Sequence, residues 1–502
     1  MAIFRKILIA NRGEIAVRIL RACRELNIAT VAVYSEADRR ALHVRLADEA
    51  ISIGPPPAAQ SYLNIANIIQ AAKESGAQAI HPGYGFLSEN PDFAQAVLDA
   101  GLVFIGPSPQ AIQSMGNKAE ARARMQTAGV PVVPGYQGSD DEFSLQSAAI
   151  EIGFPVLVKA AAGGGGKGMR VVHQPTELLE AIAAARREAL HAFRDGHLIL
   201  ERYVPKAHHI EFQVLADQHG NILHLFEREC SLQRRHQKII EETPSPLLDE
   251  ALRVEMGAAA VAAAQAVGYE NAGTVEFILD PEQRAFYFLE MNTRLQVEHP
   301  VTEFVTGLDI VQWQIRIAAG ERLPFQQADV GQRGHAIEAR LYAEDPANDF
   351  LPAIGPLLRL VEPKGPGVRV DSGFSSGDEI TIHYDALLAK IVTYAADRPS
   401  AIRKLQSALQ ETVLLGVTTN WQFLQTVLAD PDFINGSFYT TWIEEHYGDW
   451  KPPICDLPPE VLVAAALTQF QPDEPSLRTA RGLAGRDAYS PWKIANGFRN
   501  GE

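Results

Sequence analysis

Polar side chains crowd one short segment, FLEMNTRLQVEHP, which begins at Phe288 and follows an apolar run. Carboxylate and amide oxygens suit Mg²⁺ as ligands. An arginine and an amide can hold a small oxyanion, and a carboxylate beside it can remove a proton. A solvent-exposed polar edge is the alternative interpretation. The side chains at alternate positions after Phe288 are Glu290, Asn292, Arg294, Gln296 and Glu298.

The apolar segments GTVEFILD and AFYFLEMN flank a polar turn, PEQR, and this arrangement predicts an antiparallel hairpin. In a hairpin that is symmetric about Gln283, Glu276 lies opposite Glu290. Opposed carboxylates repel each other, and burying an isolated carboxylate is unfavourable, so a cation should lie between them. Asn292 shares their face, and the three residues together predict a Mg²⁺ site. If both glutamates point into solvent instead, no metal is required.

The remaining polar residues require a bend in the chain. In a straight strand the row from Glu290 to Glu298 would extend over about 26 Å, at roughly 3.3 Å per residue. Such a row is too long for one small substrate. With a bend, Arg294 and Gln296 could hold an oxyanion while Glu298 acts as its general base.

A glycine-rich loop in FPVLVKAAAGGGGKGMRVV joins two predicted strands. Free backbone N–H groups in such a loop could wrap phosphate oxygens, with Lys159 as a point charge. It is not a P-loop, because no Ser or Thr follows Lys167 and the loop leads into a strand. We therefore expect a flap over a triphosphate, and a flexible hairpin is the alternative. The glycines of the loop are Gly163, Gly164, Gly165, Gly166 and Gly168.

Two further segments contain residues that could bind a substrate. ERECSLQRRHQKIIEE offers Gln233, Arg234, Arg235, His236 and Lys238 for phosphate or carboxylate oxygens, although charged runs more often form solvated faces. In HPGYGFLSEN, two glycines allow a sharp turn that presents Tyr84, unless the turn only fills a domain edge. His209, judged alone, is more often a packed or solvated histidine.

Composition limits the classes of function. The chain has 502 residues, of which 46% are apolar, enough for three or four domains. A formal net charge of −16 argues against nucleic acid or an anionic membrane as the main partner. Cys23, Cys230 and Cys455 form no CxxC pair, and no segment resembles a signal peptide or a membrane span. We expect a cytoplasmic protein.

The elements that must position these residues follow an α/β pattern. KILIA, NRGE, IAVRILRACREL and IATVAVYS predict a βαβ unit, and residues 1–115 are expected to form a doubly wound domain with a parallel sheet. The sequence lacks GxGxxG, which argues against a dinucleotide site. We expect a linker and the flap domain over residues 116–204, and the largest domain over residues 205–447. Residues 448–502 are expected to form a proline-rich linker and a tail.

Six segments follow one another in order over residues 1 to about 447: NRGEIAVRI, HPGYGFLSEN, GGGGKGM, FERECSLQRRHQKIIEE, FLEMNTRLQVEHPVTE and IEARLYAED. In these segments the chain closely resembles the biotin carboxylase component of biotin-dependent carboxylases, which belongs to the ATP-grasp family. The resemblance implies an α/β fold with an N-terminal doubly wound parallel-sheet domain, an ATP-grasp flap domain and a large mixed-sheet C-terminal domain. ATP would lie between the last two.

The resemblance also implies a reaction. Bicarbonate attacks the γ-phosphate of ATP to form carboxyphosphate, which breaks down to CO2 and phosphate, and the phosphate deprotonates the ureido nitrogen of biotin. Glu298 would remove the bicarbonate proton, Arg340 would stabilise the biotin anion, and Tyr84 would lie by the biotin ring. Bicarbonate would be bound by Lys238, Arg294, Gln296 and the backbone of Val297.

The nucleotide and metal sites are implied in the same way. Magnesium or manganese would be held by Glu276, Glu290 and Asn292. Lys167 stands where other members often have arginine, which keeps the charge but puts bidentate phosphate contact in doubt. Besides the flap glycines, ATP would be contacted by Lys118, Lys159, Glu201, Val204, His209, Gln233, His236, Glu276 and Glu290.

The resemblance finally implies partners. No lysine has methionine on both sides, so we expect biotin to arrive on a separate biotin carboxyl carrier protein. The tail SPWKIANGFRNG is similar to the segment that follows this domain in acyl-CoA carboxylase α subunits. This favours an acyl-CoA carboxylase with carboxyltransferase subunits, such as the acetyl-CoA carboxylase of fatty acid biosynthesis, and a pyruvate carboxylase is the alternative. Family members are commonly homodimers. Another ATP-grasp ligase and a nonenzymatic nucleotide-binding regulator are competing hypotheses.

Overall fold

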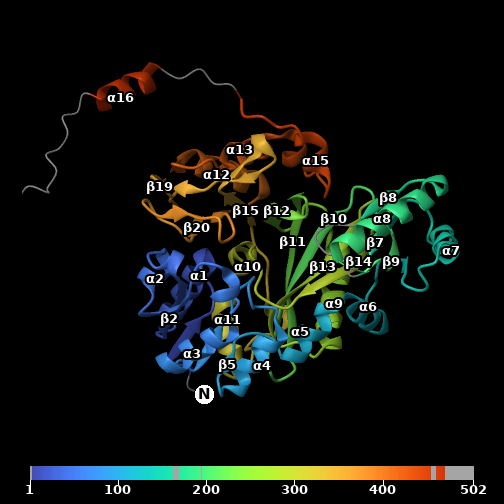
Figure 1. Cartoon of the computed structure of the whole chain (residues 1–502), viewed down its shortest axis with the longest axis horizontal. Coiled ribbons are helices and arrows are strands. Elements are labelled where there is room, and N and C mark those ends of the chain that lie inside the picture. The colour runs from blue at the N-terminus through green and yellow to red at the C-terminus, as the bar shows by residue number, and fades with distance from the viewer. Residues whose placement is uncertain (1–2, 162–168, 194, 454–458, 470–502) are drawn as a thin grey trace, which may run out of the picture. The chain divides into compact units, whose positions relative to one another are not determined.

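The computed structural model describes residues 3–161, 169–193, 195–453 and 459–469 (Figure 1). The chain divides into two compact units, residues 1–451 and 452–502. In the second unit the described residues include helix α16 (Pro459–Gln469). Across the described ranges, no helix combines the length and the apolar character needed to cross a membrane.

The first unit begins with a parallel five-stranded sheet, as the sequence predicts, in the order β3-β2-β1-β4-β5. Side chains from β1 alternate between its two faces: Ile7 and Ile9 pack with α1, whereas Leu8 packs with α3 and α4. The predicted doubly wound arrangement is therefore present. Its strands are β1 (Lys6–Ile9), β2 (Ala29–Ser35), β3 (Glu49–Gly54), β4 (Ala79–His81) and β5 (Val103–Phe104), and its main helices are α1 (Gly13–Glu25), α2 (Leu42–Leu46), α3 (Ile65–Ser75), α4 (Pro91–Asp99) and α5 (Pro109–Gly116).

A small antiparallel sheet of order β6-β9-β7-β8 follows helix α6 (Lys118–Thr127). Its strands are β6 (Gly135–Tyr136), β7 (Val156–Ala160), β8 (Arg170–Val172) and β9 (Leu198–Arg202), and α7 (Glu142–Ile152) and α8 (Leu178–Phe193) pack on it. β7 and β8 form the predicted pair of strands around the glycine loop. The predicted flap residues Gly163, Gly164, Gly165, Gly166, Lys167 and Gly168 lie outside the described residues.

The largest sheet has eight strands in the order β14-β13-β10-β11-β12-β15-β22-β20. Every pairing between them is antiparallel, a more uniform arrangement than the mixed sheet expected from the resemblance. Hairpins join several of these strands, which accounts for the antiparallel order. The strands are β10 (His208–Ala216), β11 (Ile222–Arg234), β12 (Gln237–Thr243), β13 (Asn271–Asp280), β14 (Ala285–Asn292), β15 (His335–Tyr342), β20 (Val368–Ser372) and β22 (Leu387–Ala395).

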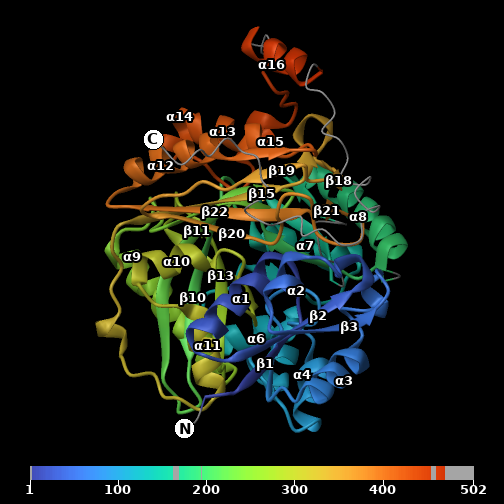
Figure 2. The same ribbon diagram turned by 90° about the vertical axis from the view of Figure 1, so that its left-hand side faces the viewer.

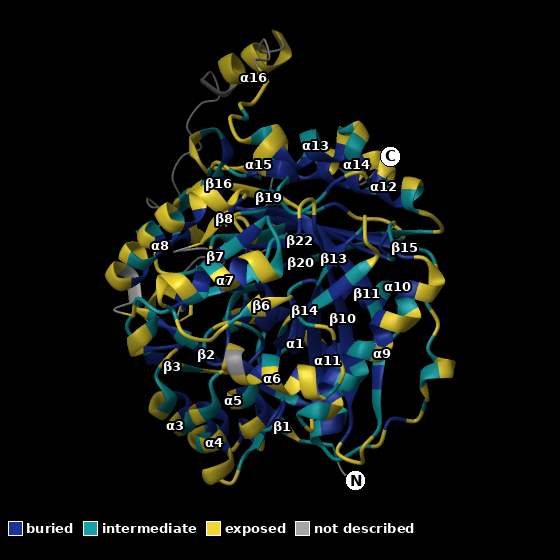
Figure 3. Ribbon diagram, turned by 90° about the vertical axis from the view of Figure 1, so that its right-hand side faces the viewer, coloured by how far each residue is buried: buried dark blue, intermediate teal, exposed yellow. Residues whose placement is uncertain are grey.

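Strand alternation decides which face of this sheet becomes polar. On β10 and β13, the apolar residues Phe212 and Phe277 face α9 (Glu250–Ala266) and form a buried core with it. The intervening residues Glu211 and Glu276 lie on the opposite face because successive side chains of a strand alternate. Figure 3 shows these central strands as almost wholly buried, while α7 and α8 expose their outer sides.

Several of the remaining helices pack against the β15–β22–β20 end of the large sheet (Figure 2). Helices α12 (Arg398–Glu411) and α13 (Trp421–Ala429) cover β15 and β22 and form a second buried core. Helix α10 (His299–Thr306) contacts β15 and β22, and α1 contacts β20. The remaining elements are α11 (Ile310–Ala318), α14 (Pro431–Asn435), α15 (Trp442–Tyr447) and three short strand pairs: β16 (Glu344–Asp345) with β17 (Leu351–Pro352), β18 (Gly355–Pro356) with β21 (Glu379–Ile380), and β19 (Arg359–Val361) with β23 (Val413–Leu415).

Candidate active site

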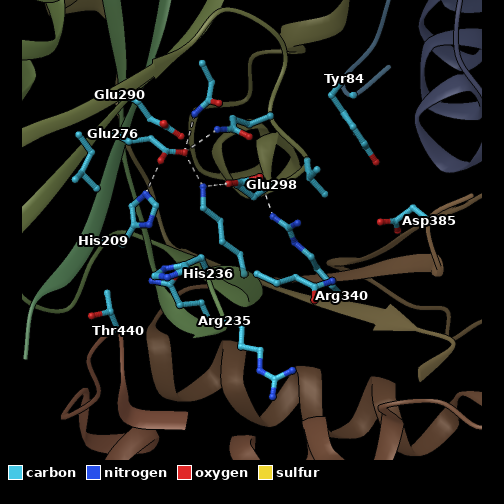
Figure 4. Close-up of a pocket in the computed structure, with 18 of the residues that line it drawn as sticks. Tyr84, His209, Arg235, His236, Glu276, Glu290, Glu298, Arg340, Asp385 and Thr440 are labelled. Atoms are coloured by element: carbon cyan, nitrogen blue, oxygen red, sulfur yellow. Dashed lines mark hydrogen bonds and ion pairs between the residues drawn. The ribbon is translucent and has the colours of Figure 1, made fainter. Parts of the chain in front are cut away.

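A cleft of about 1840 Å³ runs between the small sheet, the large sheet and the first domain. Its polar walls contain every predicted site residue whose side chain the structure describes, although these residues are spread over more than 250 positions of sequence. They are Tyr84, Lys118, Lys159, Glu201, Val204, His209, Gln233, His236, Lys238, Glu276, Glu290, Asn292, Arg294, Gln296, Val297, Glu298 and Arg340. Figure 4 shows part of this cleft.

The predicted pairing of Glu276 with Glu290 is confirmed in the β13–β14 hairpin. The register differs from the simple symmetric hairpin, because Phe277 pairs with Phe288 and a bulge at Leu289 restores the Glu276–Glu290 pair. Glu276 is nearly buried, with 7% of its side chain exposed, whereas 45% of the Glu290 side chain is exposed. In Figure 4 the two glutamates lie side by side.

The predicted bend is present directly after this hairpin. β14 ends at Asn292, and Glu298 already occupies the N-cap position of α10. Glu89 braces the turn, because its carboxylate accepts the Thr293 N–H at 3.0 Å and Arg294 Nε at 2.7 Å. The Arg294 guanidinium also donates to the Gln296 and Asn292 side chains. The polar row therefore turns back, so that Asn292 and Gln296 both donate to Glu276 and all five members line the same cleft.

Lys238 connects the two halves of the polar row. From β12 its Nζ donates to Glu276 Oε1 at 2.9 Å and to Glu298 Oε1 at 2.7 Å, and it also contacts Glu211. Burial alone would lower the pKa of Lys238, but the three carboxylates raise it well above its usual value. Burial would raise the pKa of Glu298, and Lys238 together with two arginines holds it well below the usual range instead. Both groups are charged at neutral pH.

Arg340 on β15 completes this buried cluster. Its Nη2 donates to Glu298 Oε2 at 3.0 Å, and its Nε donates to Glu241 Oε1 at 2.5 Å. Burial raises the pKa of Glu241 to about 7, although Arg340 partly offsets this effect. Arg340 thus shares a carboxylate with Lys238, and the dashed contacts of Figure 4 follow this connection.

Tyr84 enters the cleft from the first domain. Gly83 and Gly85 have φ angles of +64° and +68°, which produce the predicted sharp turn on either side of it. The Tyr84 hydroxyl donates to the buried carboxylate of Glu14. Glu14 Oε1 in turn lies 3.4 Å from Nζ of the buried Lys390, which donates to the Val297 carbonyl at 2.6 Å. These contacts link the predicted biotin residue to the predicted bicarbonate segment.

The other end of the cleft contains the residues assigned to nucleotide. Lys159 on β7 lies 2.5 Å from Glu201 on β9, and Arg122 lies 3.1 Å from the same carboxylate. Lys118 Nζ lies 3.7 Å from Glu290. His236 stands in the tight turn between β11 and β12 with a φ of +67°. Lys159 is therefore paired with a carboxylate in addition to lining the cleft.

The donor set at Glu276 and Glu290 fits the predicted divalent cation. The carboxylates supply hard oxygen ligands on one face, and Glu290 is open to the cleft. Asn292 shares this face but presents its amide nitrogen to Glu276 at 2.8 Å, while its oxygen accepts from Arg294. Glu276 also lies 2.9 Å from His209 Nε2, which places His209 inside the cluster and away from solvent.

Several cluster residues were missed by sequence reasoning. Glu211 and Glu276 are register partners, and Glu211 is two positions from His209, so period-2 alternation could have identified it. Lys390 is the single charged residue in the apolar run LLAKIVTYA. A charged residue in a buried strand needs a partner, so this pattern could have identified Lys390 as part of the cluster. Glu241 follows the aliphatic pair Ile239 and Ile240 and carries no comparable signal. The cluster contains two potential ligand sets among the described residues: His209, Glu211 and Glu276, and Glu211, Cys230 and Glu298.

Three family models match the chain. "Biotin carboxylase, N-terminal domain" matches residues 3–112, "Carbamoyl-phosphate synthase L chain, ATP binding domain" matches residues 117–326, and "Biotin carboxylase C-terminal domain" matches residues 338–445. Together the matches cover nearly all of the first compact unit.

Individual proteins resemble the chain over most of its length. The biotin carboxylase of Nostoc sp. is 53% identical over 443 residues, which are 88% of this chain and 99% of that protein. The mitochondrial methylcrotonoyl-CoA carboxylase subunit alpha of Rattus norvegicus is 49% identical over 496 residues, 98% of this chain and 69% of that protein. The biotin carboxylase domain of Hydrogenobacter thermophilus 2-oxoglutarate carboxylase, solved with MgADP, ADP and bicarbonate, gives a TM-score of 0.84 at 48% identity, covering 90% of this chain and all of that domain.

Proposed function

The chain belongs to the biotin carboxylase family, and on that premise we propose that it transfers carboxylate from bicarbonate to biotin with ATP, through carboxyphosphate. One observation carries the proposal: Glu298 lies between Lys238 and Arg340, at 2.7 and 3.0 Å, in a cleft that also contains the opposed glutamates. This reaction needs a base, two cations that bind oxyanions, and carboxylates that bind a metal, all in one place.

Bicarbonate would bind beside Lys238 and Arg294, with Gln296 and the backbone of Val297 completing its contacts. Glu298 is ionised, so it can accept the bicarbonate proton. The deprotonated oxygen then attacks the γ-phosphorus, the bond to the β-phosphate oxygen breaks, and ADP leaves. Carboxyphosphate loses CO2, and the released phosphate takes the proton from the ureido nitrogen before that nitrogen attacks CO2.

ATP would occupy the end of the cleft formed by the two antiparallel sheets. We assign its phosphates to Lys118, Lys159, His209, Gln233 and His236, together with the flap glycines Gly163–Gly166 and Gly168. The adenine would lie by Glu201 and Val204. Glu276, Glu290 and Asn292 would hold Mg²⁺ or Mn²⁺, which supplies charge neutralisation at the phosphate oxygens when bound.

Biotin would bind at the opposite end, between Arg340 and Tyr84. Negative charge develops on the ureido oxygen as the nitrogen loses its proton, and a positioned guanidinium stabilises that charge. The Tyr84 hydroxyl already donates a hydrogen bond to Glu14. The ring of Tyr84 is therefore assigned a packing role against biotin and no part in proton transfer.

Biotin is proposed to arrive on a biotin carboxyl carrier protein, and the carboxyl group to leave through carboxyltransferase subunits. The methylcrotonoyl-CoA carboxylase subunit of R. norvegicus aligns over 98% of the chain, against 88% for the Nostoc biotin carboxylase, which supports an acyl-CoA carboxylase. Acetyl-CoA and 3-methylcrotonoyl-CoA are the acceptors to test, with pyruvate and 2-oxoglutarate as alternatives. A homodimer in a reducing, cytoplasmic compartment completes the proposal. Among the described residues, Cys23 and Cys230 are free buried thiols.

The test is the release of ADP from MgATP and bicarbonate by the purified chain, with and without free biotin. We expect no turnover without bicarbonate and a rate that rises with biotin concentration. Stimulation by an amine acceptor and none by biotin would instead identify another ATP-grasp ligase. Binding of ATP without any turnover would identify a nucleotide-binding regulator.

A further inference from the structure

Asn420 is a buried polar residue, 1% exposed, that bonds to the strand carrying Arg340. It occupies the N-cap position of α13, where an asparagine oxygen commonly accepts an N–H of the first helical turn. Its side chain makes no such bond. Instead Asn420 Oδ1 accepts the Tyr342 N–H at 2.9 Å, and Nδ2 donates to the Arg340 carbonyl at 2.9 Å.

These bonds support the main chain where the regular sheet ends. β12 pairs with β15 only as far as Ala339, and the pairing of β15 with β22 becomes irregular between Leu341 and Tyr342. The Asn420 N–H donates in addition to the Tyr342 carbonyl at 3.2 Å. Because buried main-chain groups need partners, this one residue satisfies three groups just past the end of the ladder.

The guanidinium of Arg340 is held separately by Glu241 and Glu298. Its position in the cleft therefore depends on two anchors, the carboxylates at the tip and Asn420 at the main chain. A displacement of about 1 Å at a reacting centre can lower a rate a hundredfold, so the second anchor matters for the chemistry. Asn420 does not itself line the cleft.

We propose that Asn420 is a positioning residue for Arg340: it fixes the main chain of residues 340–342 and so aims the guanidinium at the ureido group of biotin. The inference rests on the proposed role of Arg340. Asn420 acts through Arg340 and touches no substrate. Glu298 keeps its contact with Lys238 when Arg340 shifts, so the loss should be larger in the biotin-dependent reaction than in the reaction without biotin.

The test is a double-mutant cycle of Asn420→Ala and Arg340→Ala in the whole chain. ADP release is measured with bicarbonate and free biotin, and again with bicarbonate alone. Asn420→Ala should lower kcat of the biotin-dependent reaction at least tenfold, while the biotin-independent rate and KM for ATP change less than twofold. In the Arg340→Ala background the same substitution should lower the biotin-dependent rate less than twofold, because residues that act as a unit are not additive.

Asn271→Ala is the matched control. Asn271 is also 1% exposed and also bonds main-chain groups, the Gln314 carbonyl and the Ala272 N–H, away from Arg340. It should lower Tm without a selective loss of the biotin-dependent rate. If Asn420→Ala does not fold, Asn420→Asp serves instead, since it keeps the acceptor for Tyr342 and removes the donor to Arg340.

Equal losses of both rates in Asn420→Ala, or a full tenfold loss on top of Arg340→Ala, would overturn the positioning role. A loss in Arg340→Ala with none in Asn420→Ala would overturn it as well, but would leave the proposed function intact. If Arg340→Ala itself has no selective effect on the biotin-dependent rate, the role assigned to Arg340 fails, and the inference about Asn420 fails with it.

Discussion

Replacing Glu298 by glutamine should stop bicarbonate-dependent turnover while the protein still binds ATP. The carboxylate is fully buried, and the substitution keeps its shape but removes the charge and the ability to accept a proton. Positioned general bases contribute about 10²–10⁴ in rate, so kcat should fall by that factor, which is about 3–5 kcal/mol of barrier.

The expected loss of stability is smaller than for a lone buried ion pair. Breaking such a pair typically costs about 3–5 kcal/mol. Here Lys238 keeps Glu211 and Glu276, and Arg340 keeps Glu241, so neither cation is left without a carboxylate. We expect the free energy of unfolding to fall by about 1–3 kcal/mol.

The assay combines ADP release with the calorimetric affinity for ATP, and Glu303→Gln is the matched control. Glu303 is a buried carboxylate on the same helix, α10, paired with Arg18 and Arg369 but absent from the walls of the cleft. The control should lose stability and keep its turnover within about threefold, well below the general-base factor. The reasoning is refuted if Glu298→Gln weakens ATP binding by the same factor as turnover, or if its turnover is retained.

Three further predictions concern the metal, a buried lysine and pH. Glu276→Gln should raise the Mg²⁺ concentration for half-maximal ADP release at least tenfold, and an unchanged metal titration would contradict the assigned site. Lys390→Met removes the cation that donates to the Val297 carbonyl and faces two buried carboxylates. The free energy of unfolding measured in urea should therefore fall by about 3–5 kcal/mol. A loss below about 1 kcal/mol would argue against an electrostatic role for Lys390. Burial would raise the pKa of Glu303, but its two arginines lower it to about 2, so its stabilising effect is present above the unfolded pKa and is lost as pH falls. Between pH 6 and 3.5 the wild type should lose about 1 kcal/mol more than Glu303→Gln, and equal losses would contradict the pairing.

Local sequence pattern was sufficient to bring together the residues that we propose bind the metal. The alternation on β13 and β14 placed Glu276, Glu290 and Asn292 on one face, and the charge conflict between the glutamates pointed to a cation. The pairing was right even though the register is not symmetric about Gln283, because the bulge at Leu289 supplies the missing residue. Periodicity cannot predict such a bulge, since it reflects packing in the finished sheet.

The residues that support Arg340 could not be predicted from local pattern. Asn420 reaches β15 from the start of a helix 80 positions further along the chain, and its sequence neighbours GVTTN indicate only a turn. Glu241 contacts Arg340 across two neighbouring strands whose register is set by the whole sheet. These contacts depend on tertiary placement, so a single sequence contains no periodic signal for them.

The low pKa of Glu298 is compatible with its proposed role as a base once the charge of the substrate is considered. A carboxylate whose pKa lies well below its usual range is a weak base, and in the free protein Lys238 and Arg340 keep it in that state. Bicarbonate bound beside Lys238 and Arg294 would bring a negative charge close to Glu298 and would compete for the same cations. A nearby like charge raises the pKa of a carboxyl group, so the substrate itself would make Glu298 more basic. The cluster would thus keep the base ionised while the cleft is empty and increase its proton affinity when bicarbonate arrives.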